Sequence, residues 1–159
     1  MEHDQNCKPS VAKTIRHEVV HLVIAVSLSL LFYLYSSDIW LVLWVFGVCM
    51  FLDADHLFDY GLYILKTKKK FSLREFLSGE YFAEWKNFIT PLHSWEMVIL
   101  FALLYLFIPN NFLIGTSFAL AAHYFVDYFT NSVNKMAYFI LYRASYDFKK
   151  IAIRKDFNE

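Results

Sequence analysis

Histidine and carboxylate residues recur together in four places of the sequence, each time at the spacing of residues that share one face of a helix. These four pairs are His17/His21, Asp53/His56, His93/Glu96 and His123/Asp127. Imidazoles interleaved with carboxylates suit Zn²⁺, Mn²⁺ or Fe²⁺, whereas a total of only 2 Cys argues against a closed thiolate site. The pattern therefore predicts a divalent metal centre, with Zn²⁺ as the first choice.

The candidate residues fall into two roles. The expected metal ligands are Asp53, His56, His93, His123 and Asp127, with His17 and His21 as further ligands near the start of the first apolar stretch. Glu96 and Asp55 are the expected catalytic carboxylates, either as general base or as hydrogen-bond partners that orient the ligands. The alternative for all of them is a structural polar network without metal, because a buried His and Asp can also satisfy each other by hydrogen bonds.

The elements that must position these residues are four apolar stretches, at about 19–35, 39–57, 92–108 and 112–130. Each is close to the roughly 17–25 residues that cross a bilayer. The whole chain is 58% hydrophobic and 19% charged, against roughly 45–50% and about 25% in soluble domains. In lipid, backbone groups must be bonded within helices. The sequence therefore predicts an all-α integral membrane protein, a four-helix bundle of two transmembrane hairpins in one domain over 1–159.

Turn residues separate the apolar stretches. Ser36-Ser37-Asp38 offers N-caps for the second stretch, and Pro109-Asn110-Asn111 makes a turn that ends in a cap for the fourth. Thr90-Pro91 places a cap and then a proline at the expected first helical position of the third stretch. Such turns predict where each hairpin begins and ends.

The positions of the charges predict the orientation. The 15 Lys and Arg precede the first stretch, lie between the second and third, or follow the fourth, and the two short turns carry none. Because cations are retained on the cytoplasmic side, both termini are expected in the cytoplasm, in the cell (inner) membrane. The formal net charge is +0 and no basic stripe is visible, so we expect membrane lipid and no nucleic acid as a partner.

Two polar segments have the pattern of helices that lie on a membrane surface. Residues 72–89 begin with the capping box Ser72-Leu-Arg-Glu75 and then carry apolar residues at near-helical spacing. Residues 136–153 mix aromatic residues with Lys and Arg. We expect both to form amphipathic interfacial helices, the first of which covers the polar cluster.

A second chemical pattern, His17-Glu18-Val19-Val20-His21, matches H-E-x-x-H. In metalloproteases this motif places two histidines on one helical face, with the glutamate as general base. The alternative function is therefore a membrane metalloprotease, for which a third ligand must come from another helix.

Three motifs together resemble a known family. Asp53-Ala-Asp55-His56, Leu92-His93-Ser94 and the block from His123 through Asp127 to Thr130 look like the D-x-D-H, T-H-S and H-x-x-x-D-x-x-T motifs of the predicted membrane-bound metal-dependent hydrolases of the YdjM type. An N-terminal histidine, here His17 or His21, is also similar. Phe88-Ile89 stands where that family usually has a His-Arg pair. The resemblance implies a metal-dependent hydrolase.

The leading hypothesis is a hydrolase that uses one or two divalent cations at the cytoplasmic side of the bundle. Its substrate is expected to be a membrane-associated ester or phosphoester, such as a phospholipid, because the site lies at the membrane surface. The alternatives are the metalloprotease and a metal-binding or structural membrane protein without catalysis.

The expected orientation has a direct test. A cysteine that replaces Asn110, in the turn before the fourth stretch, should react with a membrane-impermeant thiol reagent only from the outside, because the cation-free turns are placed there. Labelling only from the cytoplasmic side would contradict the orientation of the whole bundle.

Overall fold

The chain is mostly helical in the computed structural model, which describes residues 11–78, 81–85, 87, 89–131 and 134–149. Within these ranges the only pairing of extended backbone is an isolated bridge between Asn87 and Lys149. The described part of the chain thus contains helices and no strand, in agreement with the helical class expected from the sequence.

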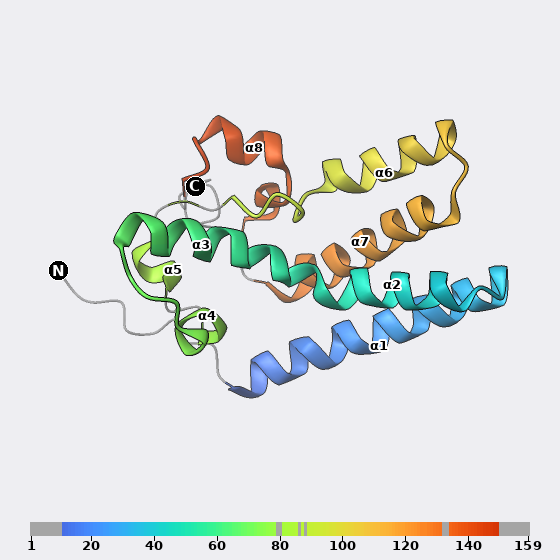
Figure 1. Ribbon diagram of the computed structural model, residues 1–159, viewed down its shortest axis with the longest axis horizontal. Helices are drawn as coiled ribbons and strands as arrows, with labels where there is room; N and C mark the ends of the chain where they lie inside the picture. Colours follow the sequence, from blue (N-terminus) through green and yellow to red (C-terminus); the bar gives the residue numbers. More distant parts are fainter. Residues whose placement is uncertain (1–10, 79–80, 86, 88, 132–133, 150–159) are drawn as a thin grey trace.

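Four helices run side by side as two antiparallel hairpins (Figure 1). α1 (Val11–Ser36) turns at Ser37 into α2 (Ile39–Phe51). α6 (Trp95–Phe107) turns into α7 (Asn111–Thr130). α7 packs against α1, α2 and α6 and is therefore the central helix. Both short turns lie at the same end of the four helices, on the right in Figure 1.

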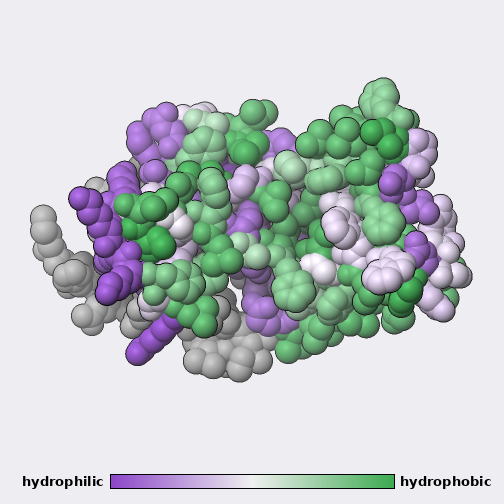
Figure 2. Space-filling model, viewed as in Figure 1, coloured by the Kyte–Doolittle hydropathy of each residue, from purple (hydrophilic) through white to green (hydrophobic). Residues whose placement is uncertain are grey.

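Three helical segments are long and apolar enough to cross a membrane: Arg16–Ser36, Ile39–Thr67 and Asn111–Thr130. α6 is also apolar but has only 13 residues. Many large hydrophobic side chains on these helices are exposed. Figure 2 shows hydrophobic residues over most of the face formed by the four helices, whereas hydrophilic residues gather mainly at the left-hand end. This distribution suits a chain surrounded by lipid.

The second apolar segment is longer than expected. α2 continues through a 3₁₀ turn, η1 (Leu52–Asp55), into α3 (His56–Thr67), and it stops where Lys68 adopts a positive φ of 56°. A stretch of 3₁₀ backbone inside a helix often marks a functional position. Here it carries Asp53 and Asp55, two of the candidate site residues.

The third apolar stretch becomes helical later than expected. α6 begins at Trp95 with Ser94 as its N-cap residue, so the prediction of Thr90 as N-cap and Pro91 as first helical residue is wrong. The Leu92 amide donates to Asp55 Oδ2 at 3.0 Å, and the His93 amide donates to the carbonyl of Thr90 at 3.1 Å. These bonds hold residues 90–94 in tight turns. His93 therefore lies outside the helix that carries Glu96. The prediction that these two residues share one face of a helix is wrong.

Two of the expected N-caps are confirmed. Asp38 Oδ1 accepts the amide protons of Trp40 at 2.9 Å and Leu41 at 3.4 Å, at the start of α2. Asn110 Oδ1 accepts from the Phe112 amide at 2.8 Å, at the start of α7. Both caps satisfy backbone donors at the outer turns, where each hairpin reverses.

The expected single helix over 72–89 is wrong. The described residues form two short helices instead, α4 (Leu73–Ser78) and α5 (Tyr81–Glu84). Helical structure does not reach Ile89 because the amide of Ile89 donates to both carboxylate oxygens of Asp59, at 3.0 and 3.1 Å. Asp59 and Ile89 are 30 positions apart in the sequence. The Asp59 carboxylate thus accepts the amide proton that a carbonyl of the same helix would otherwise accept.

α4 and α5 pack on α3 through a tyrosine cluster. Tyr60 donates a hydrogen bond to the Glu75 carboxylate at 2.8 Å. The Tyr63 hydroxyl lies between two carboxylates, 3.1 Å from Glu75 and 2.9 Å from Glu84, and can give its single proton to either of them. Glu84 also forms an ion pair with Lys69 at 2.7 Å. These contacts therefore hold α4 and α5 against α3.

The expected helix over 136–153 is also interrupted. A 3₁₀ turn, η2 (Lys135–Tyr138), precedes α8 (Ile140–Ser145), and residues 150–153 lie outside the described part. Glu96 is the reason for the break, because its two carboxylate oxygens accept the first two amide protons of α8 at 3.0 and 3.1 Å. α8 thus begins where a side chain of α6 caps it.

The hairpins approach each other closely at Gly115 of α7. A Cβ atom at this position would lie 2.9 Å from Val45 Cγ2 and 3.2 Å from Leu41 Cδ1 of α2. Val45, Leu41 and Ala119 are completely buried at this contact. Small residues allow such close packing between helices in membranes.

Replacing Gly115 with leucine should lower the free energy of unfolding in detergent by about 1–3 kcal/mol, because the added side chain overpacks the contact with α2. Gly61→Leu is the matched control, since no atom lies within 4 Å of a Cβ built at Gly61 in α3. Equal unfolding midpoints for the two variants would contradict the close approach of α2 and α7.

Candidate metal centre

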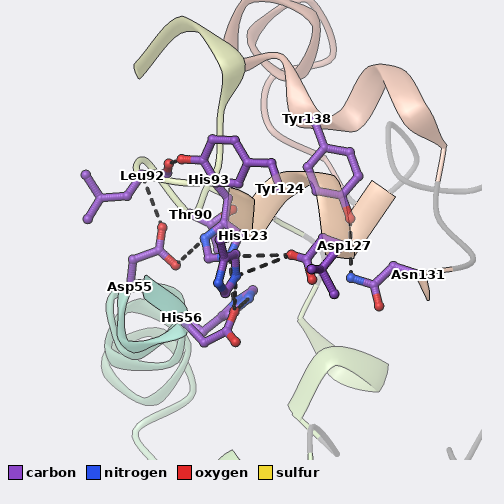
Figure 3. Close-up of polar contacts among 12 residues, drawn as sticks. Asp55, His56, Thr90, Leu92, His93, His123, Tyr124, Asp127, Asn131 and Tyr138 are labelled. Carbon is purple, nitrogen blue, oxygen red and sulfur yellow. Dashed lines mark hydrogen bonds and ion pairs between the residues drawn. The ribbon is translucent and has the colours of Figure 1, made fainter. Parts of the chain in front are cut away.

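Candidate residues from separate parts of the chain meet at the end of the four helices opposite the two short turns. They come from the first half of α1, from η1, from the turn before α6 and from the second half of α7: His17, His21, Asp53, His93, His123 and Asp127. Figure 3 shows His56, His93, His123 and Asp127 pointing toward one another. The structure therefore brings all seven expected metal ligands, His56 included, into one region.

The central group contains Asp53, His93, His123 and Asp127, with one ligand atom from each lying within 4.8 Å of the others. Asp53 Oδ1 is 3.1 Å from His93 Nε2 and 3.5 Å from His123 Nε2. Asp127 Oδ2 is 3.6 Å from His123 Nε2 and 3.9 Å from His93 Nε2. Two carboxylates and two imidazoles thus face a common point.

A second group forms on the other oxygen of Asp127. Asp127 Oδ1 lies 3.2 Å from His21 Nε2 and 3.4 Å from His17 Nε2, and the two histidine nitrogens are 3.1 Å apart. The His17/His21 pair of the sequence pattern therefore faces the core of the bundle. Asp127 belongs to both groups, with one oxygen turned toward each.

Asp55 and His56 lie beside the central group. Asp55 Oδ1 is 2.8 Å from His93 Nδ1, as an ion-pair contact, while Asp55 Oδ2 accepts the Leu92 amide proton. His56 Nε2 is 3.8 Å from Asp53 Oδ1. Asp55, His56 and His93 also meet the distance condition for a metal group. Because Asp55 contacts the outer nitrogen of His93, it orients that ring toward Asp53.

The hydrogen bond of His123 determines which of its nitrogens faces the group. His123 Nδ1 lies 2.9 Å from the carbonyl oxygen of Cys49, and a carbonyl can only accept. Nδ1 therefore carries the proton and donates it, which leaves Nε2 with a free lone pair in the neutral ring. This lone pair points at the oxygens of Asp53 and Asp127.

His17 is fixed in the same way. Its Nδ1 atom lies 2.9 Å from Thr130 Oγ1, and the Thr130 hydroxyl already donates its single proton to the carbonyl of Val126 at 2.9 Å. Thr130 must therefore accept from His17 Nδ1. The Nε2 lone pair of His17 is directed at Asp127, as that of His123 is.

These lone pairs leave a set of acceptors that a cation would fit. His123 is 1% exposed, and in the described part of the chain its Nε2 atom has no hydrogen-bond partner. Lone pairs and carboxylate oxygens repel one another unless a proton or a metal ion lies between them. A tetrahedral ion bonded at about 2.0–2.2 Å separates its ligand atoms by about 3.3–3.6 Å. Several of the observed distances lie in that range.

Three carboxylates lie outside these groups, and two of them, Glu96 and Glu18, were candidates from the sequence. Glu96, an expected catalytic residue, caps α8. Glu18 of the H-E-x-x-H pattern is exposed, whereas His21 is buried, so the pattern brings its histidines inward without its expected base. Asp59 is buried and binds the Ile89 amide. Asp55 remains next to the centre, as a partner of His93.

Arg143 supports the turn that carries His93, a role that the sequence did not reveal. It is completely buried, and its guanidinium donates to the carbonyls of Ile89, Thr90 and His93 at 2.7–3.0 Å and to Thr90 Oγ1 at 2.6 Å. Burial lowers the pKa of Arg143, while the nearby Asp55 carboxylate acts in the opposite direction. The sequence signal that could have indicated this role is a single arginine among the aromatic residues of segment 136–153.

Tyr124 of α7 also fixes this turn. Its hydroxyl donates to the carbonyl of Leu92, directly before His93 (Figure 3). Tyr124 is completely buried and packs against the rings of His93 and Trp95. α7 therefore contributes a support for His93 in addition to His123 and Asp127.

The chain matches no family model, and no curated protein or solved structure is significantly similar to it. The likeness of its three motifs to the YdjM-type hydrolases therefore stays a prediction.

Replacing Arg143 with methionine should lower the free energy of unfolding by about 2–4 kcal/mol, because buried carbonyl groups of the turn lose a charged donor. Lys149→Met is the control, since the Lys149 side chain is exposed and forms an ion pair with the exposed Asp147. Thermal unfolding in detergent would measure the difference, and an unchanged midpoint in Arg143→Met would show that the turn does not depend on this residue.

Proposed function

We propose that the protein is a metal-dependent hydrolase with four membrane spans and cytoplasmic termini, related to the YdjM-type family, and that it cleaves a membrane-associated ester or phosphoester. The observation that carries this proposal is the orientation of His17 and His123. Each donates its Nδ1 proton outward and turns the Nε2 lone pair toward a carboxylate. Metal-binding histidines characteristically have such an outer hydrogen-bond acceptor.

The two oxygens of Asp127 support two cations. Oδ1 faces His17 and His21, while Oδ2 faces His93 and His123. One carboxylate can therefore bridge a pair of ions, with Asp53 completing the second ligand set. Donor sets of imidazole and carboxylate suit Zn²⁺ first, and Mn²⁺ or Fe²⁺ next. In such a site, bound metal would lower the pKa of water toward about 7 and polarise the ester.

Asp53 is the carboxylate at the open side of the centre. Its side chain is 42% exposed, whereas those of His93 and Asp127 are each 5% exposed. Water and substrate therefore have access at Asp53. Its Oδ1 atom faces the histidines, so its second oxygen is the acceptor that we assign to the proton of the attacking water. The water oxygen would bond to the acyl carbon or the phosphorus, the bond to the alcohol oxygen would break, and the proton would leave with the alcohol.

One alternative remains, a membrane protein that binds metal without catalysis. It is favoured by the engagement of both carboxylates that the sequence suggested as bases. Glu96 caps α8, and Asp55 contacts His93 and the Leu92 amide. Hydrolysis then depends on Asp53 alone.

The decisive variant is Asp127→Asn, which keeps size and hydrogen bonding but removes the charge. We expect metal affinity to fall at least about tenfold, because Asp127 belongs to two of the three candidate metal groups. Metal content is measured in detergent-purified protein before and after chelation. Asp38→Asn, at the outer end of α2, is the control and should keep its metal.

Unchanged metal in Asp127→Asn would refute the metal centre. If metal is bound, phospholipid vesicles of phosphatidylethanolamine and phosphatidylglycerol provide the second measurement, with fatty acids and head groups detected by mass spectrometry. Metal-dependent release that is lost in Asp53→Asn supports the hydrolase. Bound metal with no release from any ester substrate favours the non-catalytic alternative.

A further inference from the structure

An apolar groove lies beside the candidate metal centre. It has a volume of about 360 Å³ and is lined by residues of α2, η1, α6 and α7, together with Leu92. Figure 1 shows α2 and α6 on either side of α7, and all three helices contribute lining residues. The volume lies within the range of about 300–1,000 Å³ that is common for ligand sites.

The groove offers almost no polar group to a ligand. Thr116 and Trp44 are the lining residues with polar side-chain atoms, and they bind each other, because Trp44 Nε1 donates to Thr116 Oγ1 at 2.9 Å. The Thr116 hydroxyl donates in turn to the carbonyl of Phe112 at 2.7 Å. Both groups are therefore satisfied within the protein, and the groove presents hydrocarbon to its occupant.

One end of the groove reaches the candidate centre. Leu52 and Leu92 line it, and each directly precedes a candidate ligand, Asp53 and His93 respectively. From there the lining extends along α2 to Leu43, a length of about 13 Å at 1.5 Å per residue. A molecule with an apolar chain in the groove would thus hold its polar end at Asp53, the exposed carboxylate of the centre.

We propose that this groove binds an acyl chain of a membrane lipid whose ester or phosphoester group lies at the metal centre. This inference rests on the proposed hydrolase function and names the substrate class. The groove opens on a face whose exposed side chains, such as Trp44, Phe51 and Leu100, are hydrophobic, so bilayer lipid is the medium around it.

A helix from a second copy of the chain is a poorer fit. A helix about 10 Å in diameter would occupy about 1,000 Å³ over the same 13 Å, so most of it would lie outside a groove of about 360 Å³. A single acyl chain is much thinner than a helix. The dimensions of the groove and its position beside the centre therefore agree on a lipid chain.

A substitution at Gly47 would fill part of the groove. It lines the cavity, and no atom lies within 4 Å of a Cβ built at this position. Gly47→Leu therefore adds a side chain to the groove whose Cβ atom meets no protein atom. Gly61→Leu is the matched control, because Gly61 is equally open but does not line the groove.

The experiment uses the full chain in nanodiscs that contain a phosphatidylglycerol with a photoactivatable diazirine in its acyl chain. In the wild-type protein we expect labelled peptides from α2 around Gly47 and from α7 around Leu120. In Gly47→Leu this labelling should fall about tenfold, with metal content unchanged, and Gly61→Leu should label as the wild type does.

The outcomes separate this inference from the proposed function. Retained metal with equal labelling in Gly47→Leu overturns the lipid groove and leaves the hydrolase proposal standing. Labelling that depends on Gly47 in a protein without metal supports the groove and refutes the metal-dependent hydrolase. Crosslinks at Gly47 between two copies of the chain, in place of lipid, would show a helix interface and overturn the inference.

Discussion

The arrangement of carboxylate oxygens against unprotonated imidazole nitrogens is the constraint on which the rest of the structure depends. In a bundle whose outer surface is hydrophobic, such groups are costly unless a positive charge lies between them. His123 shows the problem most clearly, because it is buried and its Nδ1 proton is donated to the Cys49 carbonyl. The remaining nitrogen then faces Asp53 and Asp127. In the proposed function, a cation bound here would replace this repulsion with attraction and would connect α2, α7 and the His93 turn.

The irregular parts of the chain can be understood from the same centre. The 3₁₀ turn η1 carries Asp53 and Asp55 at the end of α2, and the turn before α6 carries His93 toward them. Neither segment is stabilised by regular α-helical hydrogen bonds. Long-range contacts take their place, namely Asp59 with the Ile89 amide and Arg143 with carbonyls of the turn. The polar end of the molecule thus stabilises backbone that a continuous helix could not place at the site.

The sequence predicts what depends on local physical chemistry. The apolar segments follow from composition, and the caps Asp38 and Asn110 follow from residue type. The clustering of polar residues follows from hairpin geometry. What it misses depends on contacts between distant residues. Glu96 looked like a partner of His93 because they are three positions apart, but its carboxylate caps α8, 44 positions along the chain. The helix expected over 72–89 fails for a similar reason, since Asp59 binds the Ile89 amide.

The outer partners of three histidines differ in one respect. Cys49 offers His123 a neutral carbonyl and Thr130 offers His17 a neutral hydroxyl, whereas Asp55 offers His93 a carboxylate. A carboxylate partner raises the basicity of an imidazole more than a neutral acceptor does, because it stabilises positive charge on the ring. His93 is therefore the strongest electron donor of the three. The histidine with the charged outer partner thus lies on a turn between helices, whereas the two with neutral partners lie on α1 and α7.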